Sequence, residues 1–139
     1  MENKIRVVIK EVDKPAVVKE IDNDYKVFQH VVGGLIGMTS LPNSEDIDII
    51  FNDEYLLNGS KANVLLPERE HLLCGNVIFA GYEDEDGSTT GLSDEQLKQV
   101  LDYIEKNKVF NMDAAMAYFV MKEKKLFDEY INSKDMEAE

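Results

Sequence analysis

The stretch Val31-Val32-Gly33-Gly34-Leu35-Ile36 constrains the fold most, because two glycines there separate a helical pattern from a strand pattern. Before it, Asp22-Asn23-Asp24 offers helix-capping side chains, and apolar residues follow at helical spacing from Tyr25. After it, residues 35–41 have the pattern of a strand. Glycine adopts positive φ without a Cβ clash and so ends helices well. We therefore predict a helix of about two turns that leads directly into a sheet.

Runs rich in β-branched and aromatic residues predict the other strands of that sheet. They are residues 5–10, 16–21, 47–52 and 76–82. The last run is apolar on both faces, which indicates a strand inside the sheet. The order of strand, strand, helix, strand, strand implies a helix on one face of a mainly antiparallel sheet. Residues 52–73 show no regular pattern, so we expect an irregular connection there that covers the sheet or lines a site.

Two helices are predicted at the C-terminal end. Ser93 and Gln96 form a capping box, so one helix should begin there and run to about Asn107. The second should span residues 113–131, and its first half is apolar nearly all round. Such a helix either packs across its own sheet or joins two copies by dimerisation or swapping. The predicted fold class is α+β, a single structural unit with a sheet domain at 1–92 and C-terminal helices at 93–139.

The negative charge is concentrated in the middle of the chain. Residues 43–95 hold thirteen acids and two bases, and so carry −11 of the net charge of −13. Such a field repels nucleic acid and favours basic partners or cations, although acidity also simply keeps a protein soluble. Whether these acids share one face depends on the fold.

Cysteine content and hydropathy predict a cytoplasmic protein with no disulfide and no membrane contact. Cys74 is the only cysteine, so no intramolecular disulfide can form. The N-terminus has no apolar run after a basic start, and no stretch reaches the length of a membrane span.

The acidic loop, His71 and Cys74 could in principle bind a metal or act as a nucleophile, but their spacing favours ordinary structural roles. In the acidic loop, aligning Gly87 with the sixth position of a calcium loop puts Tyr82 first and Ser93 twelfth. A calcium loop needs Asp at the first position and Glu at the twelfth, so both essential ligands are missing. His71 and Cys74 lie three residues apart, but they supply too few ligands for a structural zinc site. We expect a small core residue at Cys74, and we predict no catalytic residue, metal or cofactor.

Several of these stretches together resemble domain-of-unknown-function family 3846, small uncharacterised proteins of phages, mobile elements and Gram-positive bacteria. The resemblance covers about residues 4–106. It rests on Glu20-Ile21-Asp22-Asn23, the double-glycine junction, Phe51-Asn52-Asp53-Glu54, Gly75-Asn76-Val77-Ile78-Phe79-Ala80-Gly81 and Leu92-Ser93-Asp94-Glu95-Gln96. The chain has Lys61-Ala62-Asn63 and Pro67-Glu68-Arg69 where the family is expected to carry a proline-asparagine-arginine signature. The resemblance implies a phage-type origin and supplies no catalytic residues.

Two functional hypotheses follow. The first is a non-enzymatic interaction protein that mimics nucleic acid and binds a basic host protein. Its candidate acidic residues are Asp53, Glu54, Glu83, Asp84, Glu85 and Asp86. The alternative is a small-molecule module that binds a nucleotide in a groove beside the first helix. Its candidate donors are Asn52, Asn58, Asn63 and Arg69.

Overall fold

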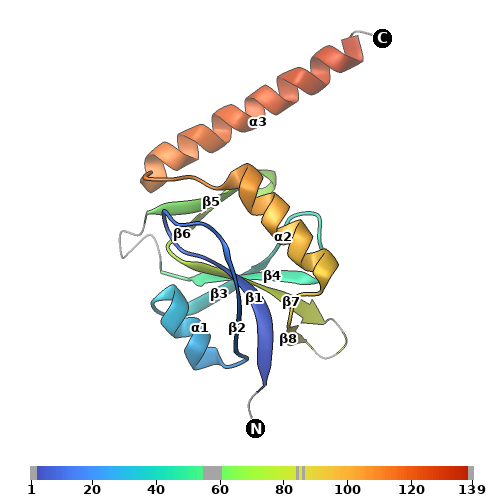
Figure 1. Ribbon diagram of the computed structural model, residues 1–139. Helices are drawn as coiled ribbons and strands as arrows, with labels where there is room; N and C mark the ends of the chain where they lie inside the picture. The colour runs from blue at the N-terminus through green and yellow to red at the C-terminus, as the bar shows by residue number, and fades with distance from the viewer. Residues whose placement is uncertain (1–2, 55–60, 84, 86, 138–139) are drawn as a thin grey trace.

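The computed structural model describes residues 3–54, 61–83, 85 and 87–137. Its elements, in chain order, are β1 (Lys4–Lys10), β2 (Val17–Asp22), α1 (Tyr25–Val32), β3 (Ile36–Ser40), β4 (Ile47–Asn52), β5 (Ala62–Leu66), a 3-10 turn (Pro67–Arg69), β6 (His71–Cys74), β7 (Val77–Glu83), β8 (Ser88–Thr90), α2 (Asp94–Asn107) and α3 (Ala114–Glu137). Figure 1 shows them stacked in layers, with α1 below the main sheet and α3 above the β5 and β6 pair. The predicted α+β class is confirmed.

The main sheet has six strands in the order β2-β1-β7-β4-β3, with β8 paired to the end of β7. All of its pairings are antiparallel, and β7 lies at the centre as its apolar sequence predicts. Gly81 allows β8 to approach, since a Cβ there would lie 2.5 Å from Thr90 Oγ1. The strand β8 was not predicted, because three residues are too few to show a period.

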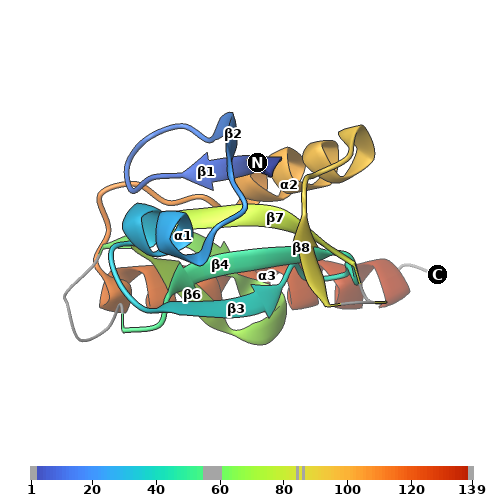
Figure 2. The same ribbon diagram turned by 90° about the horizontal axis from the view of Figure 1, so that it is seen from below.

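Strand residues alternate between the two faces of this sheet and so build two cores. On one face, α1 covers alternate residues of β1, β4 and β7, including Val7, Ile50 and Ile78, with its own Phe28 and Val32. Figure 2 looks at the sheet from this side, with α1 in front and α3 behind. On the other face, Ile49 and Phe79 pack against α2 and against β5 and β6.

The β5 and β6 strands form a separate antiparallel pair between the main sheet and α3. Val64, Leu66 and Leu73 belong to the main core, whereas Leu65, Leu72 and Cys74 pack under α3 with Ala117 and Met121. The expectation of an irregular connection over residues 52–73 is therefore wrong for its second half. Alternation fails to reveal β5 because both of its faces are buried.

The predicted helix ends are confirmed where the sequence carries a glycine end or a capping box. Gly33 ends α1 with φ of 86°, and its N–H donates to the Gln29 carbonyl oxygen at 2.8 Å. Ser93 and Gln96 form the predicted capping box at the start of α2. The last helix begins where expected but continues to Glu137, beyond the predicted end at residue 131. No helix in the described part of the chain is long and apolar enough to cross a membrane.

Candidate functional site

The candidate acidic residues lie at opposite ends of the main sheet. Because β4 and β7 are antiparallel and Ile47 pairs with Gly81, the chain after β4 lies beside the start of β7. Asp53 and Glu54 therefore lie at one end, and Glu83 lies at the other, roughly 26 Å away at about 3.3 Å per strand residue. Glu85 follows Glu83 and is exposed, whereas Asp84 and Asp86 lie outside the described residues.

The register brings other acids to the end that holds Glu83. The turn before β4 lies there, and the Tyr82 N–H donates to the Asp46 carbonyl oxygen at 2.9 Å. Two shallow hollows of about 420 and 600 Å³ share Tyr82 and Glu45 in their lining, with Asp46 in one and Asp48 in the other. We call Glu45, Asp46, Asp48, Glu83 and Glu85 the acidic sheet end.

Three of these five acids were not singled out from the sequence. Glu45, Asp46 and Asp48 precede Glu83 by more than thirty residues, and only the pairing of β4 with β7 brings them together. The turn signal at Pro42-Asn43-Ser44 could have placed them at a strand end. The partner strand and the register were needed to place them beside Glu83.

The two described asparagines of the alternative groove use their side chains for internal hydrogen bonds. Asn52 Nδ2 donates to the Val32 carbonyl oxygen at 3.2 Å, and its Oδ1 accepts from the Glu54 N–H at 2.8 Å. Asn63 is fully buried, and its Nδ2 donates to the carbonyl oxygens of Lys10 and Gly75. Both residues therefore hold neighbouring segments together. Asn58 lies outside the described residues.

Arg69 joins the 3-10 turn to the outer edge of the main sheet. Its guanidinium donates to Thr39 Oγ1, to the Ser40 carbonyl oxygen and to Ser40 Oγ. Acceptors on the last two residues of the edge strand β3 are thereby satisfied within the protein. Arg69 is exposed, but its donors already serve this contact.

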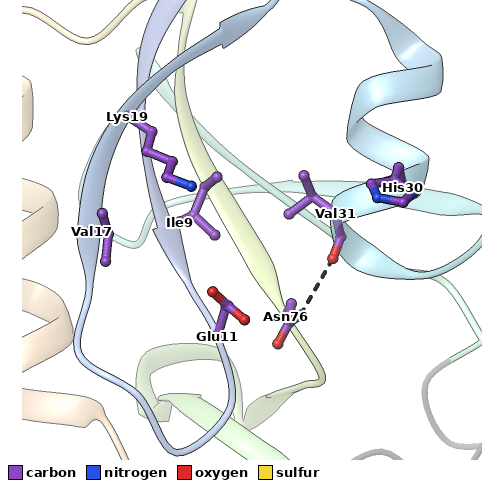
Figure 3. A pocket seen from close by; sticks show the side chains of 7 residues that line it. All are labelled: Ile9, Glu11, Val17, Lys19, His30, Val31 and Asn76. Atoms are coloured by element: carbon purple, nitrogen blue, oxygen red, sulfur yellow. Dashed lines mark hydrogen bonds between the residues drawn. The ribbon is translucent and has the colours of Figure 1, made fainter.

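A hollow of about 400 Å³ lies between the first hairpin and α1 (Figure 3). Its lining combines apolar and polar side chains, namely Ile9, Glu11, Val17, Lys19, His30, Val31 and Asn76. Asn76 connects the two sides of the hollow. The Asn76 Oδ1 accepts from the Val12 N–H at 3.0 Å, and the Asn76 Nδ2 donates to the Val31 carbonyl oxygen at 3.5 Å. Lys19 and His30 are the basic side chains among its described lining residues. Its residues come from three distant segments of the chain, so no sequence pattern indicates this hollow.

Comparison with protein families identifies the group to which this chain is related. The model of a domain of unknown function, DUF3846, matches residues 5–105, well over half of the chain. The chain belongs to this family. No curated protein and no solved structure matches it.

The DUF3846 region contains both cores of the main sheet, the acidic sheet end and the hollow beside α1. It ends inside α2, which spans Asp94–Asn107, and all of α3 lies outside it. The helix that follows is therefore an addition to the DUF3846 fold in this chain.

His71 and Cys74 are the first and last residues of β6 and lie in different surroundings. Cys74 is fully buried under α3, and burial raises the pKa of its thiol to about 11. Burial, with a smaller contribution from Arg69, lowers the pKa of His71, whose ring meets Phe51 edge to face at 5.8 Å between centroids. Among the described residues, no three His, Cys, Asp or Glu side chains form a group that could hold a metal ion.

Proposed function

We propose that the protein is a non-enzymatic interaction protein of phage or mobile-element type, which binds a basic host protein as a nucleic-acid mimic. The acidic sheet end is the binding surface. One observation carries this proposal: the register of β4 and β7 brings Glu45, Asp46 and Asp48 to the same end of the main sheet as Glu83, which Glu85 follows.

Rigidity matters because a charged surface binds best when its groups are already in place. Tyr82 ties the turn before β4 to β7, and Gln96 Nε2 donates to the Asp46 carbonyl oxygen at 2.9 Å from the start of α2. Glu45, Glu83 and Glu85 are exposed. A basic partner is therefore attracted over a distance by the field and meets an ordered surface on contact.

The test compares two variants that lose equal charge from different places. One carries Glu45→Gln, Glu83→Gln and Glu85→Gln, and the matched control carries Glu20→Gln, Asp102→Asn and Glu129→Gln, which are also exposed. Each tagged protein is used to capture partners from host lysate at low and high salt, with and without added duplex DNA.

We expect the wild type and the control to retain a nucleic-acid-binding protein at low salt, and to lose it when salt or duplex DNA is added. The sheet-end variant should lose it at every salt concentration. Equal capture by the two variants, or a captured protein that DNA does not displace, would contradict the proposal.

A second candidate function is supported by the hollow beside α1. Lys19 and His30 in its lining can meet an anionic group, which makes a nucleotide or a similar small anion the ligand to test. A ligand that binds the folded state raises the melting temperature by mass action. A thermal-shift screen of nucleotides should show such a rise for the wild type and a smaller one for Lys19→Met. No stabilisation by any nucleotide would refute this candidate.

A further inference from the structure

The two halves of α3 have different surroundings. In the first half, Ala117 and Met121 are buried against β5 and β6, and Lys124 and Lys125 bond to Asn107 and Glu70. Figure 1 shows the second half continuing past the body. Large apolar side chains nevertheless continue along it: Leu126 is 60% exposed and Phe127 is 63% exposed. Helix propensity does not explain these large apolar residues, because polar residues form a solvent-exposed helix equally well.

The five most exposed apolar residues of α3 form one stripe on the side of the helix opposite the body, while the less exposed Tyr118 and Ile131 flank it. At 100° per residue, Met116, Phe119, Leu126, Phe127 and Tyr130 all lie within a narrow sector of the helix surface. Ala117 and Met121 lie on the other side, where the body is. The stripe therefore runs from Met116 to Tyr130, from the half that the body supports into the half beyond it.

The stripe is large enough to support a stable dimer. Its members are 55% to 65% exposed. With about 200 Å² for a side chain of this size, five of them expose roughly 600 Å² per copy. Two copies would bury about 1,200 Å², which is the lower end of the range for specific interfaces, before the flanking residues are counted.

Charge favours a second copy on this surface over approach by any other face. Residues 114–131 of the helix carry Lys122, Lys124 and Lys125 against Glu123, Asp128 and Glu129, so this part is neutral within a protein of net charge −13. Two copies that meet through α3 keep their acidic sheet ends apart, and Glu123 is an acid that lies within the sector of the stripe.

The spacing of the stripe is also self-complementary about its centre. Glu123 lies midway between Met116 and Tyr130. A two-fold axis near Glu123 therefore brings Met116 close to the partner's Tyr130, and Phe119 close to the partner's Phe127. An isologous contact of this kind closes with two subunits.

We propose that α3 pairs with α3 of a second copy in antiparallel orientation, through the stripe of Met116, Phe119, Leu126, Phe127 and Tyr130. The unsupported half of each helix then lies over the supported half of the other. Antiparallel pairing puts the two bodies at opposite ends of the helix pair, which keeps their net negative charges apart and aligns the helix dipoles favourably. This inference does not depend on the acidic sheet end.

The first test measures the oligomeric state by sedimentation equilibrium. The wild type should be a dimer, and Phe127→Glu should weaken the dimer by about 30-fold or more, as expected for a central aromatic contact. Phe127 lies past the contacts with the body, so the fold should persist, and circular dichroism checks this. The control is Val18→Glu, which replaces an exposed apolar residue on β2 and should leave the dimer intact.

The second test measures orientation by disulfide cross-linking. Cys74 is buried, so the wild type should not cross-link. Oxidising a mixture of Met116→Cys and Tyr130→Cys proteins should give the mixed disulfide, whereas Met116→Cys alone should give none. A monomeric wild type, a dimer that Phe127→Glu leaves unchanged, or a Met116→Cys protein that cross-links to itself would overturn the proposal.

Discussion

Lys10 is a charged residue with no exposed surface. Its Nζ donates to Asn63 Oδ1 at 2.8 Å and to the Glu11 carbonyl oxygen at 2.9 Å, and it lies 5.1 Å from the centre of the Phe110 ring. Asn63 also donates back to the Lys10 carbonyl oxygen at 2.7 Å. Together these contacts join β1 to β5 and to the segment between α2 and α3. A buried ammonium costs free energy even when it is well bonded.

The pH dependence of stability should reveal this cost. Burial lowers the pKa of Lys10, with Asp13 opposing and Lys108 adding to the shift. Below the folded-state pKa, Lys10 carries its proton in both the native and the unfolded state, so the full free-energy cost of burying the ammonium is present. As pH rises through that pKa toward the ordinary value, the native state loses its proton first, so stability gains. The melting temperature of the wild type should therefore rise relative to Lys10→Met as pH increases.

A control for this comparison is Lys26→Met, which removes an exposed lysine. Its melting temperature should keep a constant difference from the wild type over the same pH range. A constant difference for Lys10→Met as well would show that the buried ammonium does not titrate with folding.

The Cys74 thiol should be inert in the native protein. It is fully buried, its pKa is raised to about 11 by burial, and only the thiolate reacts with disulfide reagents. Reaction with such a reagent at mildly alkaline pH should wait for unfolding and should become fast in denaturant. Fast reaction without denaturant would mean that α3 lifts off the β5 and β6 pair. The sequence predicted the core role of Cys74, because a lone cysteine entering an apolar strand is usually a small core residue.

At the scale of elements, the sequence predicted those that carry their own local signals. The first two strands, α1, β4, β7 and α2 each have a cap, a glycine end or a distinct apolar pattern. The pair β5 and β6 has none, since Val64-Leu65-Leu66 is apolar in every position. Alternate residues there face different cores, one under the main sheet and one under α3. A strand buried on both faces loses the period that would identify it.

The capping box at the start of α2 gives an element-scale prediction. Ser93 Oγ accepts from the Gln96 N–H at 3.2 Å, and Gln96 Oε1 accepts from the Ser93 N–H at 2.8 Å. Ser93→Ala should lower the free energy of unfolding by about 1 kcal/mol, because one helix N–H loses its partner. Urea denaturation measures the change. Ser93→Asp retains an acceptor and should cost much less; an equal loss would assign the effect to packing.

At the scale of the whole molecule, position along the sheet decides what the acids can do together. The sequence predicted an acidic middle segment, but its composition did not show which acids are neighbours. The antiparallel register sends Asp53 and Glu54 to one end and brings Glu45 and Glu83 together at the other. Register depends on contacts between distant strands, and the sequence of one strand does not encode it.

The two proposed contacts should respond to salt in opposite ways. Binding of a basic partner at the acidic sheet end should weaken as salt rises, because screening removes attraction. The α3 dimer should strengthen, because screening removes repulsion between two copies of net charge −13. Sedimentation equilibrium at low and high salt measures the second effect. Glu123→Gln should also strengthen the dimer several-fold, since it removes two like charges near the two-fold axis, while Glu105→Gln should not.

The β5 and β6 pair separates α3 from the main sheet, and this affects how the protein can open and how its relatives can differ. α3 rests on the outer surface of that pair, and among the described residues its hydrophobic cluster includes none from the main sheet. The helix can detach as a unit while the six-stranded sheet stays folded, so its amide protons should exchange with solvent well before those of β7. A relative that ends where the family match ends, at residue 105, would leave the outer surface at Leu65 and Leu72 uncovered. We expect polar residues at those positions in such proteins.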